Sequence, residues 1–360
     1  MTEPKSTILS KVSPSKIIIP IILGLAIVIY LIYSEWDQKA VDLFAINKFV
    51  VLFIAISFFM MFLRDVGYMI RLRILSDKKL SWKKIFYIIM LWEFASAISP
   101  SAVGGTTVAT YFIYKEGISL GKSTAIVMAT AFLDELYFIV FFPLVIFFVG
   151  IDLLFSDTSS FANNYLYFAF IGYGIKFIFD IFIAYGLFVN PRALKNILTA
   201  IFRLWFLKKW RDKAAQTGDE IITASGELKN KSFLFWLKSF GATIISWTAR
   251  YWVVNFLLLA LLSGINLQHY GIRFFEHFEI FARQLIMWVM MLVLPSPGAS
   301  GFAEAVFSDY LSIFIPVGFV ALLALAWRMV SYYPYLLVGV FLLPPWIRRT
   351  HTKKEKTSTD

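Results

Sequence analysis

Charged side chains inside long apolar stretches are the first candidates for chemistry in this chain. Asp134 and Glu135 are adjacent in one apolar run, and Arg250, Arg283 and Arg328 lie in others. Ionisable groups at membrane depth are costly, so each is a candidate for function. The forked guanidinium of arginine suits a phosphate headgroup. These residues therefore predict a site that binds an anionic lipid headgroup.

A structural interpretation of the same charges stays open, because buried arginines need counter-charges. Carboxylates available as partners at membrane depth are Asp134, Glu135, Glu93 and Glu304. Lys176 and Asp180 are one helical turn apart, and their spacing favours a simple i,i+4 ion pair.

Two polar breaks interrupt apolar segments, one in each half of the chain. Residues 99–107 read SPSAVGGTT and residues 294–304 read LPSPGASGFAE. Proline and glycine favour an irregular backbone, which survives in a membrane where protein buries it or where it lines a wet cavity. Such paired breaks predict a substrate site between internal repeats, with two tight loops as the alternative. The candidate binding residues at the breaks are Pro100, Ser101, Gly104, Gly105, Thr106, Pro297, Gly298, Gly301 and Glu304.

The composition predicts an all-α polytopic membrane protein that would position these residues. The chain has 360 residues, of which 59% are hydrophobic and 16% charged, and soluble proteins carry about 25% charge. A β-barrel would show short alternating segments instead of long apolar runs. The formal net charge of +11 comes from clusters in loops and tails, so it indicates membrane topology and not a nucleic-acid partner.

The apolar runs predict about eight transmembrane helices and one or two re-entrant hairpins. The expected domains are a basic tail (1–16), one integral membrane domain (17–346) with an amphipathic insertion (191–232), and a second basic tail (347–360). Positive charge places both tails and the insertion in the cytoplasm. The expected crossings are residues 17–33, 46–63, 124–149, 165–189, 233–262, 278–294, 312–326 and 329–343.

The charges in the loops predict on which face of the membrane the first broken segment enters and leaves. A basic stretch after residue 63, including Arg64 and Arg71, is expected to form a cytoplasmic loop. Since Lys115 and Lys122 follow the broken segment 85–114, that segment should enter and leave on one face as a re-entrant hairpin. An inverted repeat would place the second hairpin on the opposite face, which the charges do not decide.

Enzyme constellations are absent from the sequence. It contains no cysteine, no HExxH, no Walker-type loop and no Gly-x-Ser-x-Gly. His269, His277, Glu276 and Glu279 lie near one another in sequence, but loop histidines are usually only solvated. We therefore expect no metal, no cofactor and no enzymatic reaction from this chain alone.

Several motifs together are similar to a known family. Arg71-Leu72-Arg73 follows the second apolar run, Pro100 and Gly104-Gly105 mark the first break, and residues 114–119 read YKEGIS. A Pro-x-Pro-Gly-x-x-Gly-x-x-Glu pattern ends at Glu304. The chain resembles the lysylphosphatidylglycerol synthase transmembrane-region family from about residue 46 to residue 343. That resemblance implies lipid translocation, without the aminoacyl-transferase domain that some members carry.

The function expected is translocation of an anionic phospholipid or a lipid-linked glycan, in a bacterial cytoplasmic membrane. The two breaks would form a groove near the middle of the membrane. Alternatives are a membrane-embedded enzyme that modifies lipid headgroups, and a gradient-coupled solute transporter. The partners expected are membrane lipids, together with either a second copy of the chain or a separate soluble enzyme.

Overall fold

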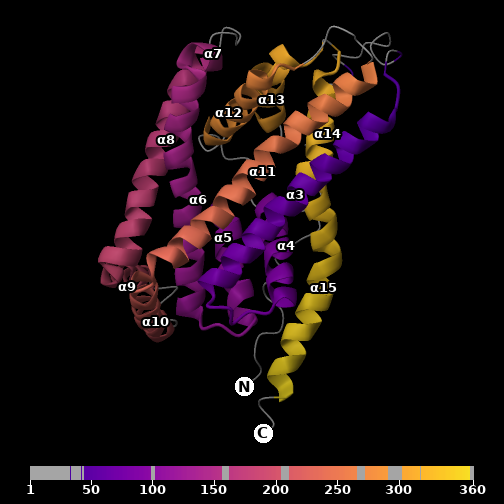
Figure 1. Ribbon diagram of the computed structural model, residues 1–360. Helices are drawn as coiled ribbons and strands as arrows, with labels where there is room; N and C mark the ends of the chain where they lie inside the picture. Colours follow the sequence, from indigo (N-terminus) through magenta and orange to yellow (C-terminus); the bar gives the residue numbers. More distant parts are fainter. Residues whose placement is uncertain are drawn as a thin grey trace.

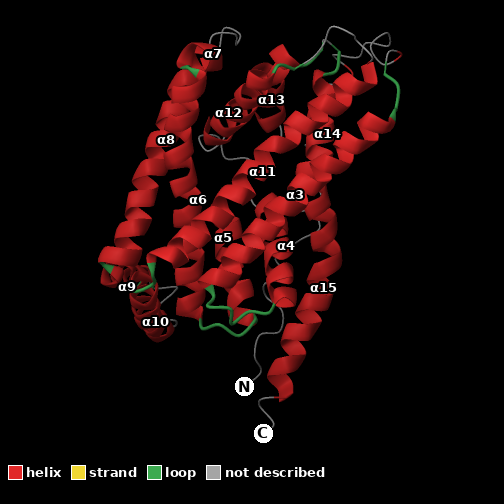
Figure 2. Ribbon diagram, viewed as in Figure 1, coloured by secondary structure: helices red, strands yellow, loops and turns green. Residues whose placement is uncertain are grey.

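The computed structural model describes residues 33, 42, 44–98, 102–155, 162–203, 211–265, 272–290, 302–316 and 318–356, without the side chains of 102–104, 106–107, 162–164, 302–305 and 351–356. Within these residues the chain is helical and has no β-strand (Figure 2). The all-α membrane fold class is confirmed. The described stretches that are long and apolar enough to cross a membrane are Lys48–Leu75, Leu120–Val149, Tyr165–Val189, Phe233–Ile265 and Val320–Thr350.

Two long helices, α3 (Lys48–Leu75) and α11 (Phe233–Ile265), run side by side and antiparallel along the molecule (Figure 1). Asn47 caps α3 by accepting hydrogen bonds from two backbone N–H groups, and its amide donates to the Ser263 carbonyl oxygen at 2.6 Å. Further along, a Cβ on Gly67 would lie 2.3 Å from Ser246 Oγ. Only glycine therefore allows the two backbones to approach this closely.

The first break joins two short helices, α4 (Trp82–Ile98) and α5 (Ala102–Lys115). At 1.5 Å per residue each leg is about 20–25 Å long, less than the roughly 30 Å hydrocarbon core of a membrane. Lys84 Nζ, near the start of α4, donates to the carbonyl oxygen of Glu116, just after α5, at 2.6 Å. The two legs therefore start and finish at the same end of the molecule, as a re-entrant hairpin does.

The second break joins α12 (Phe274–Met290) to α13 (Phe302–Leu311). Near the end of α13, the Tyr310 hydroxyl donates to the Leu154 carbonyl oxygen in α7 (Ile151–Phe155) at 2.7 Å. In Figure 1 this second hairpin lies at the upper end, whereas α4 and α5 lie in the lower half. The two hairpins thus open to opposite ends, which is the arrangement that an inverted repeat requires.

Three expectations about the crossings are wrong. The run 278–294 does not form a crossing of its own, because its described part belongs to α12, a 17-residue leg of the second hairpin. The helix expected to end at residue 63 continues to Leu75, so Arg64 and Arg71 are buried inside α3 and do not belong to a loop. The runs 312–326 and 329–343 do not cross separately, because α14 (Val320–Ser331) and α15 (Tyr333–Lys356) stack into one stretch. Of the run 17–33, all but residue 33 lies outside the described residues.

The remaining helices build one side of the molecule and its lower end in Figure 1. They are α6 (Leu120–Val149), α8 (Ala162–Ala184), the π-helical turn η1 (Tyr185–Val189), α9 (Pro191–Ile201) and α10 (Arg211–Lys229). The expected amphipathic insertion corresponds to α9 and α10, which lie at the same end as the open mouth of the first hairpin. Its placement in the cytoplasm stays a prediction.

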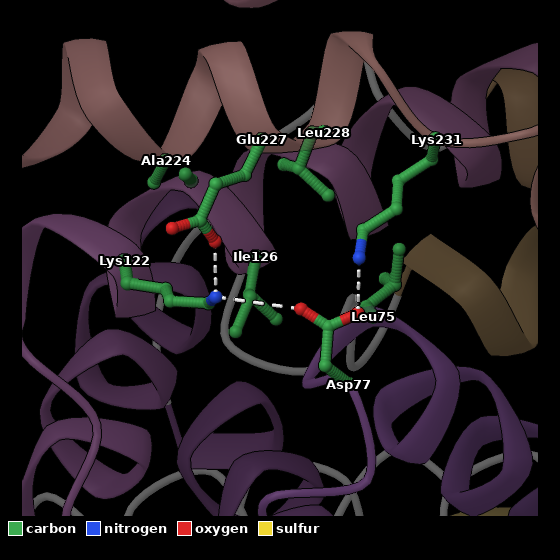
Figure 3. A pocket seen from close by; sticks show the side chains of 9 residues that line it. Leu75, Asp77, Lys122, Ile126, Ala224, Glu227, Leu228 and Lys231 are labelled. Atoms are coloured by element: carbon green, nitrogen blue, oxygen red, sulfur yellow. Dashed lines mark hydrogen bonds and ion pairs between the residues drawn. The ribbon is translucent and has the colours of Figure 1, made fainter.

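An ion-pair network joins α10 to the rest of this lower end (Figure 3). Asp77, in the turn after α3, accepts from Lys231 at 2.5 Å and from Lys122 at 3.4 Å, and Lys122 also pairs with Glu227. Partial burial alone would raise the pKa of Asp77, but the hydrogen bonds and charges of the two lysines outweigh it and hold that pKa below its usual value. The network ties α10 to the turn and to α6.

The YKEGIS motif proves to be structural. Buried Glu116 accepts from Trp346 Nε1 at 2.9 Å and pairs with Arg349, so it anchors α15 to the end of α5. Gly117 adopts a φ of 105°, which glycine tolerates at a helix end. Ser119 then caps α6.

Candidate functional site

A charged cluster lies where α3 and α11 meet the first hairpin. Arg64 is 1% exposed, and its guanidinium pairs with Glu93 of α4 at 2.5 Å and with neighbouring Asp65 at 3.0 Å. The Tyr335 hydroxyl of α15 donates to the Asp65 carboxylate at 2.9 Å. Arg64 also stacks over the rings of Tyr68 and Tyr335. Three helices are therefore joined through one arginine.

A second arginine lies on the same face of α3, two turns further on. Arg71 donates to both carboxylate oxygens of Asp134, at 2.5 Å and 3.1 Å, and to Thr243 Oγ1 at 3.0 Å. Trp247 Nε1 donates to the same carboxylate at 2.7 Å. Bidentate pairing with extra hydrogen bonds is the geometry in which a buried ion pair is stable. Asp134 is thus fully engaged by protein groups.

Arg250 differs from both of these arginines. Its guanidinium carbon lies 4.3 Å from the ring centre of Trp288 and 5.6 Å from that of Trp247. No hydrogen bond or ion pair joins it to any residue that the structure describes, and its side chain is only partly buried. Arg64 holds both nearby carboxylates, Asp65 and Glu93. The donors of Arg250 are therefore available to a ligand.

Arg250 lies between the inner ends of the two hairpins. Trp288 is two residues before the end of α12, and Glu93 is five residues before the end of α4. Arg250 is within electrostatic range of both Glu93 and Arg64. A partly exposed guanidinium against an aromatic face suits a phosphate-bearing headgroup.

The other two arginines predicted as site residues have protein contacts of their own. Arg283 is fully buried and donates to Glu279 at 3.0 Å, to the Tyr310 carbonyl oxygen at 3.2 Å, and to the Leu153 carbonyl oxygen. It thereby ties the second hairpin together and to α7. Arg328 is buried on α14 with its guanidinium over the rings of Trp327 and Tyr332.

Three of the four carboxylates predicted as partners of Arg250, Arg283 and Arg328 pair elsewhere, and the side chain of the fourth, Glu304, lies outside the described part of the structure. Asp134 binds Arg71 and Glu93 binds Arg64, whereas Glu135 binds Lys176 at 2.8 Å. Lys176 therefore reaches across to α6 instead of forming the intrahelical pair with Asp180 that its spacing predicted.

The break residues are only partly described. Gly105 packs against α4, where an added Cβ would lie 2.1 Å from Ser96 Oγ. The backbones of Gly104 and Thr106 belong to α5 and that of Glu304 to the first turn of α13. Outside the described residues are Pro100, Ser101, Pro297, Gly298 and Gly301.

Sequence reasoning missed Arg64, Asp65, Arg71 and Tyr335 as members of the central cluster. The sequence predicts a loop for the basic members, because more lysines and arginines follow them directly. The pattern that identifies them is Arg64, Tyr68 and Arg71 at i, i+4 and i+7, which places two arginines on one helical face.

The fold and this site define a polytopic helical membrane protein with two opposed hairpins and a charged centre. Residues 17–339 match the model of the lysylphosphatidylglycerol synthase transmembrane region, and the chain belongs to that family. It is also 24% identical over 281 residues to a UPF0104 membrane protein of Archaeoglobus fulgidus, covering 75% of this chain and 79% of the relative. No solved structure matches the chain.

Proposed function

We propose that this protein moves an anionic lipid, a phospholipid or a lipid-linked glycan, across the cytoplasmic membrane, with the headgroup phosphate on Arg250. The observation that carries the proposal is the guanidinium of Arg250, which lies between the hairpin ends without a hydrogen-bond partner among the described residues. Family membership supports a membrane function, and the lipid substrate is our inference from the site.

Arginine fits this role better than lysine would. Its planar fork gives two parallel hydrogen bonds to phosphate, and its weak hydration lowers the cost of bringing it to membrane depth. The guanidinium carbon lies 4.3 Å from the ring centre of Trp288, and this contact is an attraction to the ring and not a hydrogen bond to a polar acceptor, so the N–H donors are left for the ligand. No chemical change of the lipid is assigned to the chain.

The proposal includes an orientation. The lower end in Figure 1 holds α9, α10 and the last turns of α15. The turn between α3 and α4, at the open mouth of the first hairpin, carries Lys78 and Lys79, and the first turn of α4 carries Lys83. By the positive-inside rule this end faces the cytoplasm. The first hairpin then opens inward and the second outward, so a headgroup at Arg250 is approached from both leaflets.

The test is lipid movement in vesicles reconstituted with the full-length protein. A fluorescent anionic phospholipid is followed as it becomes accessible to a membrane-impermeant quencher. Arg250→Ala should slow its movement about tenfold or more, because one charge-assisted hydrogen-bond pair is worth roughly 1.5–3 kcal/mol. Arg250→Lys should give an intermediate rate.

Arg273→Ala is the matched control. It removes the same charge as Arg250→Ala, but from a side chain that is 87% exposed and lies outside the proposed site. Its rate should equal that of the wild type. Equal rates in Arg250→Ala and wild-type vesicles would overturn the proposal. Loss of folding is excluded if the variant elutes and unfolds like the wild type.

A further inference from the structure

A second charged cluster lies on the other side of α6. Because Asp134 and Glu135 are consecutive, they point about 100° apart around the helix. Asp134 faces α3 and α11, whereas Glu135 faces α8 and pairs with Lys176 at 2.8 Å. Asp180 follows Lys176 by one turn on the same buried face of α8. The cluster therefore holds two carboxylates and one ammonium group.

Asp180 is the unusual member. Its side chain is only 6% exposed, and its Oδ1 has no hydrogen-bond partner among the described residues. No ion pair within 4.0 Å joins it to Lys176, whose ammonium is held by Glu135 and lies 4.2 Å from the ring centre of Phe138. A buried carboxyl group is thus left without a partner of its own.

The surroundings of Asp180 are apolar. The elements packed against α8 are α6, α7, α12 and η1. Of their charged groups, Asp134 is engaged by Arg71, Glu279 by Arg283, Glu276 by Arg273, and Asp152 is exposed. His277 contacts Asn255, and Tyr185 of η1 is exposed. The charges that act on Asp180 are those of Glu135 and Lys176.

One ammonium group cannot balance two carboxylates in such a place. An ionised carboxylate without a partner is strongly disfavoured in an apolar environment, and the usual remedy is to bind a proton. A metal ion is a poorer remedy, because Ca²⁺ and Mg²⁺ take about six or more oxygen ligands, and no three acidic or histidine side chains among the described residues are placed to hold a metal ion together. The chemistry therefore favours a proton.

We propose that Asp180 is a proton-binding site, and that its protonation state controls the ion pair between Glu135 and Lys176. With the proton bound, Lys176 stays with Glu135; when the proton leaves, the Asp180 carboxylate competes for the same ammonium group and α8 shifts against α6. The link to lipid movement rests on the function proposed above, and it supplies a proton gradient as the energy source.

Infrared spectroscopy of the full-length protein tests proton binding directly. The wild type should show the carbonyl stretch of a protonated carboxyl group at about neutral pH, and Asp180→Asn should lose that component. The matched control is Asp219→Asn. This substitution should leave the band unchanged, because Asp219 is 64% exposed. Identical bands in the wild type and Asp180→Asn would overturn the proposal.

Vesicles with an imposed proton gradient test the coupling separately. Wild-type lipid movement should respond to the gradient, whereas Asp180→Asn should keep its downhill movement and lose the response. An equal response in both would overturn the coupling. If the wild type moves no lipid at all, the proposed function fails, and the infrared band still decides whether Asp180 holds the proton.

Discussion

Arg71 and Arg250 lie along the same pair of helices but in opposite situations. Arg71 lies over the ring of Tyr68, but it also has polar partners in the bidentate carboxylate of Asp134 and the hydroxyl group of Thr243. Arg250 has two tryptophan rings and no polar partner among the described residues. The contacts of Arg71 hold helices together, whereas Arg250 keeps hydrogen-bond donors for a ligand that binds transiently.

This contrast shows that a buried charge alone does not mark a functional site. Arg64, Arg71 and Arg283 are more deeply buried than Arg250, and each contributes to architecture. What distinguishes Arg250 is the lack of satisfied donors, which is a property of contacts and not of sequence position. The comparison can be tested by removing each arginine in turn.

Arg71→Ala should have the largest effect on stability. It leaves Asp134 without its counter-charge, and breaking a buried ion pair costs roughly 3–5 kcal/mol. Thermal unfolding in detergent measures the loss. In the double variant with Asp134→Ala, the loss should be clearly smaller than the sum of the two single losses. Additive losses would contradict the assigned pair.

Gly67→Ala should have the second largest effect on stability. The added Cβ would lie 2.3 Å from Ser246 Oγ and 2.8 Å from the Ala242 carbonyl oxygen, so α3 and α11 must move apart. Overpacking of this kind costs typically about 1–3 kcal/mol. Gly241→Ala, on α11, is the control, because nothing lies within 4 Å of its added Cβ. Equal unfolding temperatures for the two variants would show that the helices are not in tight contact at Gly67.

These two sites show how far sequence reasoning reaches. Long apolar runs, two Pro/Gly breaks and basic loops were enough for the helical membrane fold, its hairpins and Arg250 as a candidate. They were not enough for Arg64 and Arg71, because a helix that carries arginine at its buried end looks like a helix followed by a basic loop. The ion-pair partners could not be predicted from the sequence either, because which carboxylate contacts which arginine depends on how α3, α6 and α11 pack.

A smaller effect on stability is expected when acid protonates Asp77 at the lower end of the molecule. The folded pKa of Asp77 lies below its usual value, so the stability that this carboxylate provides is complete above about pH 4. It is lost as the pH falls through the lower folded pKa. Asp77→Asn should therefore be less stable than the wild type at neutral pH, and the two should converge on strong acidification. A gap that stays constant with pH would contradict the role given to the lysine pairs.

Arg250→Ala should have the smallest effect on stability, within about 1 kcal/mol, since it removes no ion pair or hydrogen bond among the described residues. A loss as large as that of Arg71→Ala would show that Arg250 is structural. Thermal unfolding of the two variants side by side makes this comparison.

The central claim is that Arg250 holds a lipid headgroup, and native mass spectrometry of the detergent-purified protein tests it most directly. The account predicts a retained anionic or glycan-linked lipid in the wild type and in Arg273→Ala, and its loss in Arg250→Ala. A lipid retained equally by all three proteins, or by none of them, would contradict the claim.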